Sequence, residues 1–228
     1  MGWANETMGR AHDQEEERRM RADAQRNAEK LRAAAAELFN ERGLDAPLKE
    51  IARRAGVSHG TLYNLFGSRE ALIDDVVADL AAARLGEAAE RALAHEDAWA
   101  GFAYYIETVC ELQITDAAIR DVVIGRYPNA LRLMAVCEST NAAAARIIER
   151  AQQAGALRPD FAHEDLLFLF GTNSLLARAA RGHAPDLWRR GIAFTLDGLR
   201  TQAAHPLPAA PLTAQQLAEV MSKLTSTP

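Results

Sequence analysis

The sequence predicts an all-α fold in which a small helix-turn-helix unit is followed by a larger helical bundle. Three observations support this prediction. Ala and Leu, both strong helix formers, dominate the 228 residues, and aromatic residues make up only 6%. Apolar residues recur at helical spacing over most of the chain, and Gly and Pro interrupt that pattern where helices would end. No alternating run bounded by turns indicates a sheet.

The composition, 49% hydrophobic and 25% charged, is that of an ordinary globular protein. No apolar run approaches the roughly 18 residues of a membrane-spanning helix, so we expect no membrane partner. The first 20 residues have no apolar core and do not form a secretory signal. With only Cys110 and Cys137, the chain is expected to be cytoplasmic with reduced thiols, and a disulfide between the two is the alternative.

The N-terminal part is expected to comprise an arm and a first helix. Residues 1–22 are polar and charged without an apolar stripe, which predicts a flexible arm, its last turn helical. A first helix is predicted over Asp23 to Arg42, and Gly43 ends it in the left-handed conformation. Its apolar stripe consists of Leu31, Ala34, Ala35, Leu38 and Phe39. It opens a predicted DNA-binding domain over residues 23–70.

Two short helices joined by a glycine turn form the predicted helix-turn-helix. The second helix of the domain starts near Pro47, whose missing N–H has no partner in a first turn. Gly56 makes the turn, and Ser58 caps a third helix that ends at Phe66. Ser68 caps a fourth helix. The residues expected to face inward are Ile51, Ala52, Val57, Leu62 and Phe66.

The outward side of the third helix is expected to contact DNA. Its residues are Ser58, His59, Gly60, Thr61, Tyr63 and Asn64. The N-terminal part of such a helix lies in the major groove, and Asn can pair with adenine, so His59 and Asn64 are the expected base readers. Thr61 and Tyr63 suit phosphate oxygens.

The charge distribution favours the same surface, although the formal net charge is −5. Cations outnumber acids between residues 42 and 69; they are Arg42, Lys49, Arg53, Arg54 and Arg69 against Asp45 and Glu50. Lys49 and Arg69 flank the third helix and suit phosphate contacts. A small DNA-reading unit on an acidic body would have this distribution.

Residues 55–72, AGVSHGTLYNLFGSREAL, resemble the signature of the TetR (tetracycline repressor) family, and residues 33–43 resemble its first helix. The likeness covers roughly residues 26 to 80. It implies a DNA-binding regulator, a repressor that binds a palindromic operator as a homodimer and is released by a small molecule. Two positions depart from the pattern: Ala46 stands where Thr or Ser often caps the second helix, and Arg69 stands where Lys is common.

Residues 71–200 are expected to form a helical ligand-binding and dimerisation domain. The predicted helices are 97–114, 116–126, 128–154, 164–181 and 186–200. The last two are apolar over more than one stripe, which indicates one face for the core and one for a partner copy. Residues 201–228 are predicted to form a linker and a short helix, with Thr213 and Gln216 spaced as a capping box.

A pocket between these helices would suit a small apolar or aromatic effector. The candidate lining residues are Trp99, Phe102, Tyr105, Met134, Cys137, Phe170 and Asn173. Each could equally be core. Asn173 differs because a buried amide needs partners, which a ligand, a dimer contact or a backbone group could supply.

Other functions are less consistent with the sequence. No paired metal-ligand spacing, phosphate loop or nucleophile elbow is present, so no catalytic residue, cofactor or metal is expected. A redox-responsive regulator acting through Cys110 and Cys137 is an alternative, although both lie in apolar helical contexts. A regulator without a small ligand is another.

Overall fold

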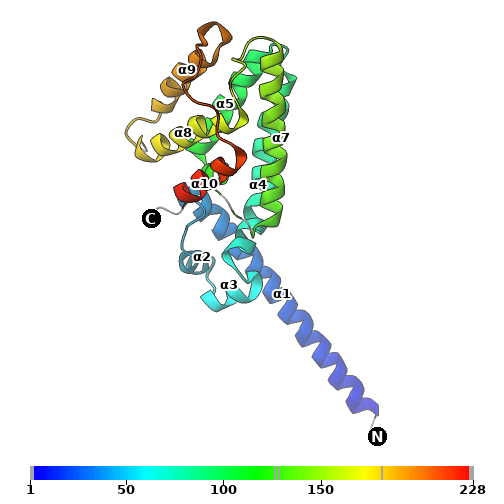
Figure 1. Cartoon of the computed structure of the whole chain (residues 1–228). Helices are drawn as coiled ribbons and strands as arrows, with labels where there is room; N and C mark the ends of the chain where they lie inside the picture. The colour runs from blue at the N-terminus through cyan, green and yellow to red at the C-terminus, as the bar shows by residue number, and fades with distance from the viewer. Residues whose placement is uncertain (1–2, 126, 128, 181, 226–228) are drawn as a thin grey trace.

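The computed structural model describes residues 3–125, 127, 129–180 and 182–225, and this part of the chain is helical apart from turns and one isolated β-bridge (Figure 1). The small N-terminal unit is formed by α1 (Trp3–Arg42), α2 (Leu48–Ala55) and α3 (His59–Phe66). The long helix α4 (Arg69–Ala94) connects it to the body. The prediction of an all-α fold is therefore confirmed over the described residues.

Helix α1 is much longer than the sequence suggested. From Trp3 onward the expected flexible arm is continuous with the first helix, and it projects away from the other helices (Figure 1). The prediction gave weight to the missing apolar stripe, but Arg, Glu, Ala, Met and Gln favour a helix without one. Ion pairs one turn apart add to this preference, such as Arg21 to Glu17 at 2.6 Å.

The turn between α2 and α3 follows the sequence closely. Gly56 has φ +69°, and the N–H of Val57 donates to Ala52 O at 3.0 Å. The Ser58 side chain accepts from the N–H of Thr61 at 3.0 Å and so caps α3 as predicted. Helix α2 begins one residue later than expected, with Pro47 as its N-cap.

The body consists of α5 (Ala98–Thr115), α6 (Ala117–Ile124), α7 (Leu131–Gln153), α8 (Leu166–Ala180) and α9 (Leu187–Leu199). Helix α5 packs against α4, α7 and α8. Figure 1 shows α8 and α9 at one side of the body and α4 with α7 at the other. The predicted helix boundaries at residues 126, 128 and 181 lie outside the described residues.

Helix α4 joins the two parts into one continuous apolar core, which extends from Leu31 to Leu196. It also determines where α7 begins. Helix α7 has no side-chain cap of its own, and its Leu133 N–H instead donates to the Asp74 carboxylate of α4 at 2.8 Å. Because α4 crosses residue 70, the division at that residue into two domains stays a prediction.

The loop between α1 and α2 is held by α6. Gly43 has φ +88°, and the Asp121 carboxylate accepts from the N–H of Leu44 at 2.8 Å. A Cβ on residue 43 would lie 2.0 Å from Asp121 Oδ2. Glycine is therefore required there both for its left-handed backbone and for the close approach of the carboxylate.

Replacing Gly43 with Ala is expected to lower the free energy of unfolding by at least about 2 kcal/mol, because it adds backbone strain to a clash. Urea unfolding at one protein concentration measures this. Gly86→Ala is the matched control, since Gly86 lies within α4 and a Cβ there meets nothing within 4 Å. We expect it to be neutral or to stabilise by about 0.5–1 kcal/mol. Equal midpoints for the two variants would contradict the role of Gly43.

Candidate nucleic-acid interface and internal cavity

Helix α3 presents a short polar face to solvent. Gly60 and Asn64 are exposed, and the Tyr63 side chain is 45% exposed. The His59 ring is half-buried and meets the Tyr63 ring edge-on, with centroids 4.9 Å apart. The two rings and the Asn64 amide thus form one surface of hydrogen-bonding groups on a helix held from behind by the buried Leu62.

Two of the expected contact residues also build the start of α3. The Ser58 and Thr61 hydroxyls lie 2.8 Å apart, and Ser58 additionally caps the helix. Ser58 remains exposed, and with Thr61 as the donor between the two hydroxyls the Ser58 O–H can still donate to a phosphate oxygen. Thr61 is half-buried. Both lie at the start of α3 with His59, and their contacts with DNA stay a prediction.

Arg69 has a structural role that the sequence did not indicate. Its Nη1 donates to Leu44 O at 2.9 Å and to Ala46 O at 2.8 Å. The guanidinium is half-buried and ties the start of α4 to the loop before α2. Ala46 is itself buried and supplies no cap, in line with its departure from the family pattern. Lys49, by contrast, is exposed at the start of α2.

Most cations of this unit are paired with carboxylates. Arg42 contacts Glu50 at 2.7 Å, and Arg54 contacts Glu41 of α1 at 3.0 Å. The hydrogen bond from Arg54 lowers the pKa of the Glu41 carboxyl below its usual value. The count of charges between residues 42 and 69 missed this, because the α1 carboxylates lie outside that segment. The net positive charge around α2 and α3 in the folded protein is therefore smaller than the count over residues 42–69 suggests.

A cavity of about 970 Å³, partly open to solvent, lies between parts of α4 to α8 and the C-terminal helix α10 (Ala214–Thr225). Four of the seven expected residues line it: Tyr105, Met134, Cys137 and Phe170. Its other walls are mainly aliphatic and include Leu85, Val109, Val122, Val123, Ile124 and Leu166. The volume is at the upper end of the range for small-molecule sites.

The other three expected residues lie outside the cavity and pack the helices together. Trp99 lies under the Arg200 guanidinium, 4.3 Å from the ring centroid, and Phe102 is fully buried. The Asn173 amide donates to Cys110 O at 3.2 Å and to Gln113 Oε1 at 2.8 Å. Asn173 thus joins α8 to α5, which is the neighbouring-backbone alternative raised from the sequence.

A few polar groups interrupt the apolar lining. They are Tyr127, Glu138, Thr140, Asn141, His163, Glu164 and Ser222. The His163 Nδ1 is buried and has no hydrogen-bond partner among the described residues. Burial and the Asp121 carboxylate both raise the pKa of Tyr127, which keeps its phenol protonated and able to donate. An apolar molecule with one or two polar groups would match this lining.

The structure adds little support for the other functions weighed from the sequence. Cys110 and Cys137 are both free, and burial raises the pKa of each thiol, which disfavours the reactive thiolate. Among the described residues, no three His, Cys, Asp or Glu side chains gather as a metal site. None of the described helices combines the length and apolarity needed to cross a membrane.

Two walls of the cavity were missed by the sequence reasoning. The aliphatic residues of α6 carry no signal that separates a cavity wall from a core. The stripe and capping box of α10 were recognised, and the two hydrogen bonds of that box are present between Thr213 and Gln216. What the stripe packs against could not be inferred.

Comparison with known proteins identifies related sequences for both parts of the chain. Residues 31–76 match the sequence profile of bacterial regulatory proteins of the tetR family. Residues 96–201 match that of the SbtR-like transcriptional regulator C-terminal domain. The chain is also 38% identical over 72 residues to the uncharacterized HTH-type transcriptional regulator YvdT of Bacillus subtilis (strain 168). That match covers 31% of this chain and 37% of YvdT.

Solved structures share the fold over about three quarters of the chain. One is the transcriptional regulator FadR from Bacillus subtilis in complex with stearoyl-CoA, with a TM-score of 0.56 and 16% identity over 77% of this chain and 98% of that one. Another is the ketosteroid transcriptional regulator KstR2 of Mycobacterium tuberculosis, with a TM-score of 0.54 and 22% identity over 76% and 94%. At these identities the likeness establishes the fold.

Proposed function

Because the chain belongs to the TetR family of bacterial regulatory proteins, we propose that it is a cytoplasmic repressor that binds a palindromic DNA operator as a homodimer. It is a DNA-binding transcriptional regulator of the helix-turn-helix class. The observation that carries the proposal is the polar face of α3, which a complete helix-turn-helix framework presents to solvent. His59 and Asn64 are the proposed base readers. Lys49, Ser58, Gly60, Thr61 and Tyr63 are the proposed phosphate contacts.

Arg69 is assigned a different part within the same surface. Its guanidinium bonds to two carbonyls of the loop before α2, so it orients α2. Any phosphate contact by Arg69 would use the donors that these two bonds leave over. Both bonds come from Nη1, so Nε and Nη2 are the donors that are left over.

The proposed effector is a small apolar or aromatic molecule held in the cavity. The support is the lining, which is aliphatic and aromatic with few polar groups. One protein of this fold is named as a complex with stearoyl-CoA, a thioester with a long apolar acyl chain, and another as a ketosteroid transcriptional regulator. Control without a small ligand is the alternative, and a cavity of about 970 Å³ favours the ligand.

Helix α6 is the proposed connection between the effector and the DNA. Its residues 122–124 line the cavity, while Asp121 holds the N–H of Leu44 before α2. At its start, Asp116 caps α6 and lies 3.5 Å from the Asn40 amide of α1. A ligand that shifts α6 would therefore alter how α2 and α3 are held.

The outer faces of α8 and α9 are the proposed dimer surface. Both helices bury one side, through residues such as Phe170 and Trp188, and expose large apolar side chains on the other. The exposed side chains are Phe168, Leu175, Leu187 and Phe194, with exposures of 64%, 67%, 44% and 63%. A second copy of the same surface would cover them, and two recognition helices could then read the half-sites of a palindrome.

The function is tested by selecting genomic DNA fragments with the purified chain at low salt. We expect enrichment of a short palindromic motif, and a binding constant that falls steeply with salt because Lys and Arg contact phosphates. His59→Ala and Asn64→Ala should relax the sequence preference. Lys49→Ala should weaken all sites alike and reduce the salt slope by about one per protomer. Failure to enrich any sequence would exclude the proposed function.

Replacing Asp121 with Ala tests the connection through α6. It leaves the Leu44 N–H and the buried Arg120 without their acceptor, and we expect DNA affinity to fall about fivefold or more in the absence of any effector. Gel-shift titration measures the change. Asp79→Ala is the control, since Asp79 pairs with Arg132 at the exposed surface. Unchanged affinity for Asp121→Ala would argue against this connection.

The dimer surface is tested with the double variant Phe168→Asp and Phe194→Asp. Charges placed in an apolar interface should yield monomers in sedimentation equilibrium and should abolish operator binding. Leu131→Asp is the control, because Leu131 is 72% exposed on α7, away from α8 and α9. A double variant that still sediments as a dimer would place the interface elsewhere.

A further inference from the structure

We infer that the C-terminal helix α10 is a built-in wall of the effector cavity, and that moving α10 away opens the cavity further to an entering molecule. That the cavity holds an effector rests on the proposed function, whereas the covering of the cavity by α10 does not. Figure 1 shows the chain returning from α9 so that α10 lies at the end of the body nearest α1.

One side of α10 faces the cavity. Four cavity-lining residues, Ala214, Leu217, Ala218 and Met221, recur at the spacing of one helical stripe. They are small or apolar, like the rest of the lining. Val220, on another side of the helix, is 36% exposed. The apolar stripe of α10 is therefore turned toward the cavity.

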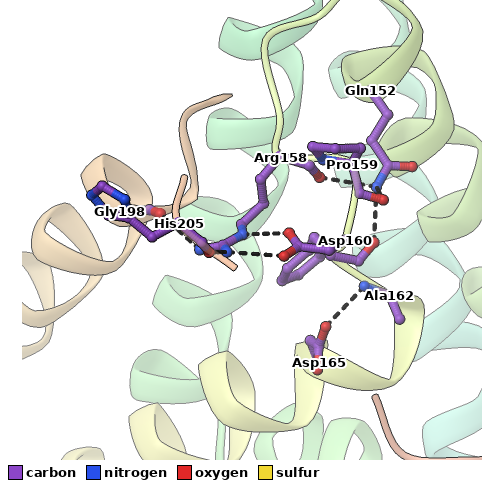
Figure 2. A network of polar contacts seen from close by, with 9 residues as sticks. Gln152, Arg158, Pro159, Asp160, Ala162, Asp165, Gly198 and His205 are labelled. Carbon is purple, nitrogen blue, oxygen red and sulfur yellow. Dashed lines mark hydrogen bonds and ion pairs between the residues drawn. The ribbon is translucent and has the colours of Figure 1, made fainter. Parts of the chain in front are cut away.

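The segment before α10 is attached to the body at a fixed point (Figure 2). Arg158 is only 8% exposed, and its Nη2 donates to His205 O at 2.6 Å. Asp160 holds the same guanidinium through two contacts, at 2.6 and 3.0 Å. The Gln152 amide in turn donates to Arg158 O at 3.1 Å and to Phe161 O at 2.8 Å. The tail thus leaves the body from a rigid loop.

Between this anchor and α10 the chain is exposed and rich in proline. Residues 205–211 are all exposed and include Pro206, Pro208 and Pro211. Prolines make such a linker semi-rigid, which limits where α10 can go. The capping box between Thr213 and Gln216 is local to the helix, so it can persist when α10 is displaced. With this anchor, linker and cap, α10 would move away from the cavity as an intact helix that stays tethered at His205.

This wall lies beyond the matched C-terminal domain profile, which ends at residue 201, before the linker and α10. A ligand enclosed here would contact Leu217 and Met221 in addition to the walls from α4 to α8. Residues beyond the matched profile would therefore help to select the ligand.

Cys137 provides a direct test, because it lines the cavity while Cys110 is fully buried. The aromatic disulfide 5,5′-dithiobis(2-nitrobenzoate) serves as the probe: the Cys137 thiolate takes one half as a mixed disulfide and releases thionitrobenzoate, which absorbs light. The full chain should react slowly. A chain ending at residue 211, which keeps the Arg158 anchor, should react at least about tenfold faster. Cys137→Ser should remove this fast phase.

A second pair of variants separates loss of the cover from misfolding. Leu217→Asp combined with Met221→Asp should accelerate the reaction like the truncation, because it charges the stripe that faces the cavity. Val220→Asp charges an exposed side of the same helix and should leave the rate unchanged. Equal rates for the full and truncated chains, or acceleration by Val220→Asp, would overturn the inference. Since the assay uses neither DNA nor an effector, a failure in operator binding would leave its result standing.

Discussion

The position of the DNA-binding unit depends on one carboxylate that fills the space left by a missing side chain. Asp121 of α6 reaches the backbone at Gly43, where a Cβ would lie 2.0 Å away, and binds the N–H of Leu44. Burial raises the pKa of Asp121, and the Leu44 N–H and the Arg120 guanidinium oppose that change. Apolar contacts tolerate sliding, whereas a hydrogen bond weakens steeply when it is misaligned. A small rotation of α6 would therefore change how α2 is held.

Several helix ends in this protein are completed by other helices, so the helices depend on one another. Arg150 of α7 donates to Leu93 O at 2.9 Å and also to His95 O at the end of α4. Asp74 of α4 caps the start of α7 in return. Terminal backbone groups that lack a local cap are thus satisfied across the α4–α7 pair. This reciprocity favours cooperative behaviour of the body.

Local signals were sufficient to predict the helix order, the caps at Ser58 and Ser68, and the turn at Gly56, because short segments determine them. Contacts between distant segments could not be predicted. The inward use of Arg69, the neutralising Glu41 and the bonds of Asn173 to α5 all depend on which helices pack together. For the same reason, only four of the seven candidate lining residues lie on the cavity. Aromatic residues such as Trp99 are natural candidates for a ligand site in a sequence, but aliphatic residues of α6 form part of the cavity wall.

The short linker after His205 has a consequence for how strongly any ligand can bind. A segment tethered this closely acts at an effective concentration in about the millimolar range, so α10 returns to the cavity after each displacement. A ligand already inside would then gain the apolar contacts of Leu217 and Met221. Ligands that reach these two side chains would dissociate more slowly than ligands that do not. The tail would thus lengthen the residence time of the molecules that it contacts.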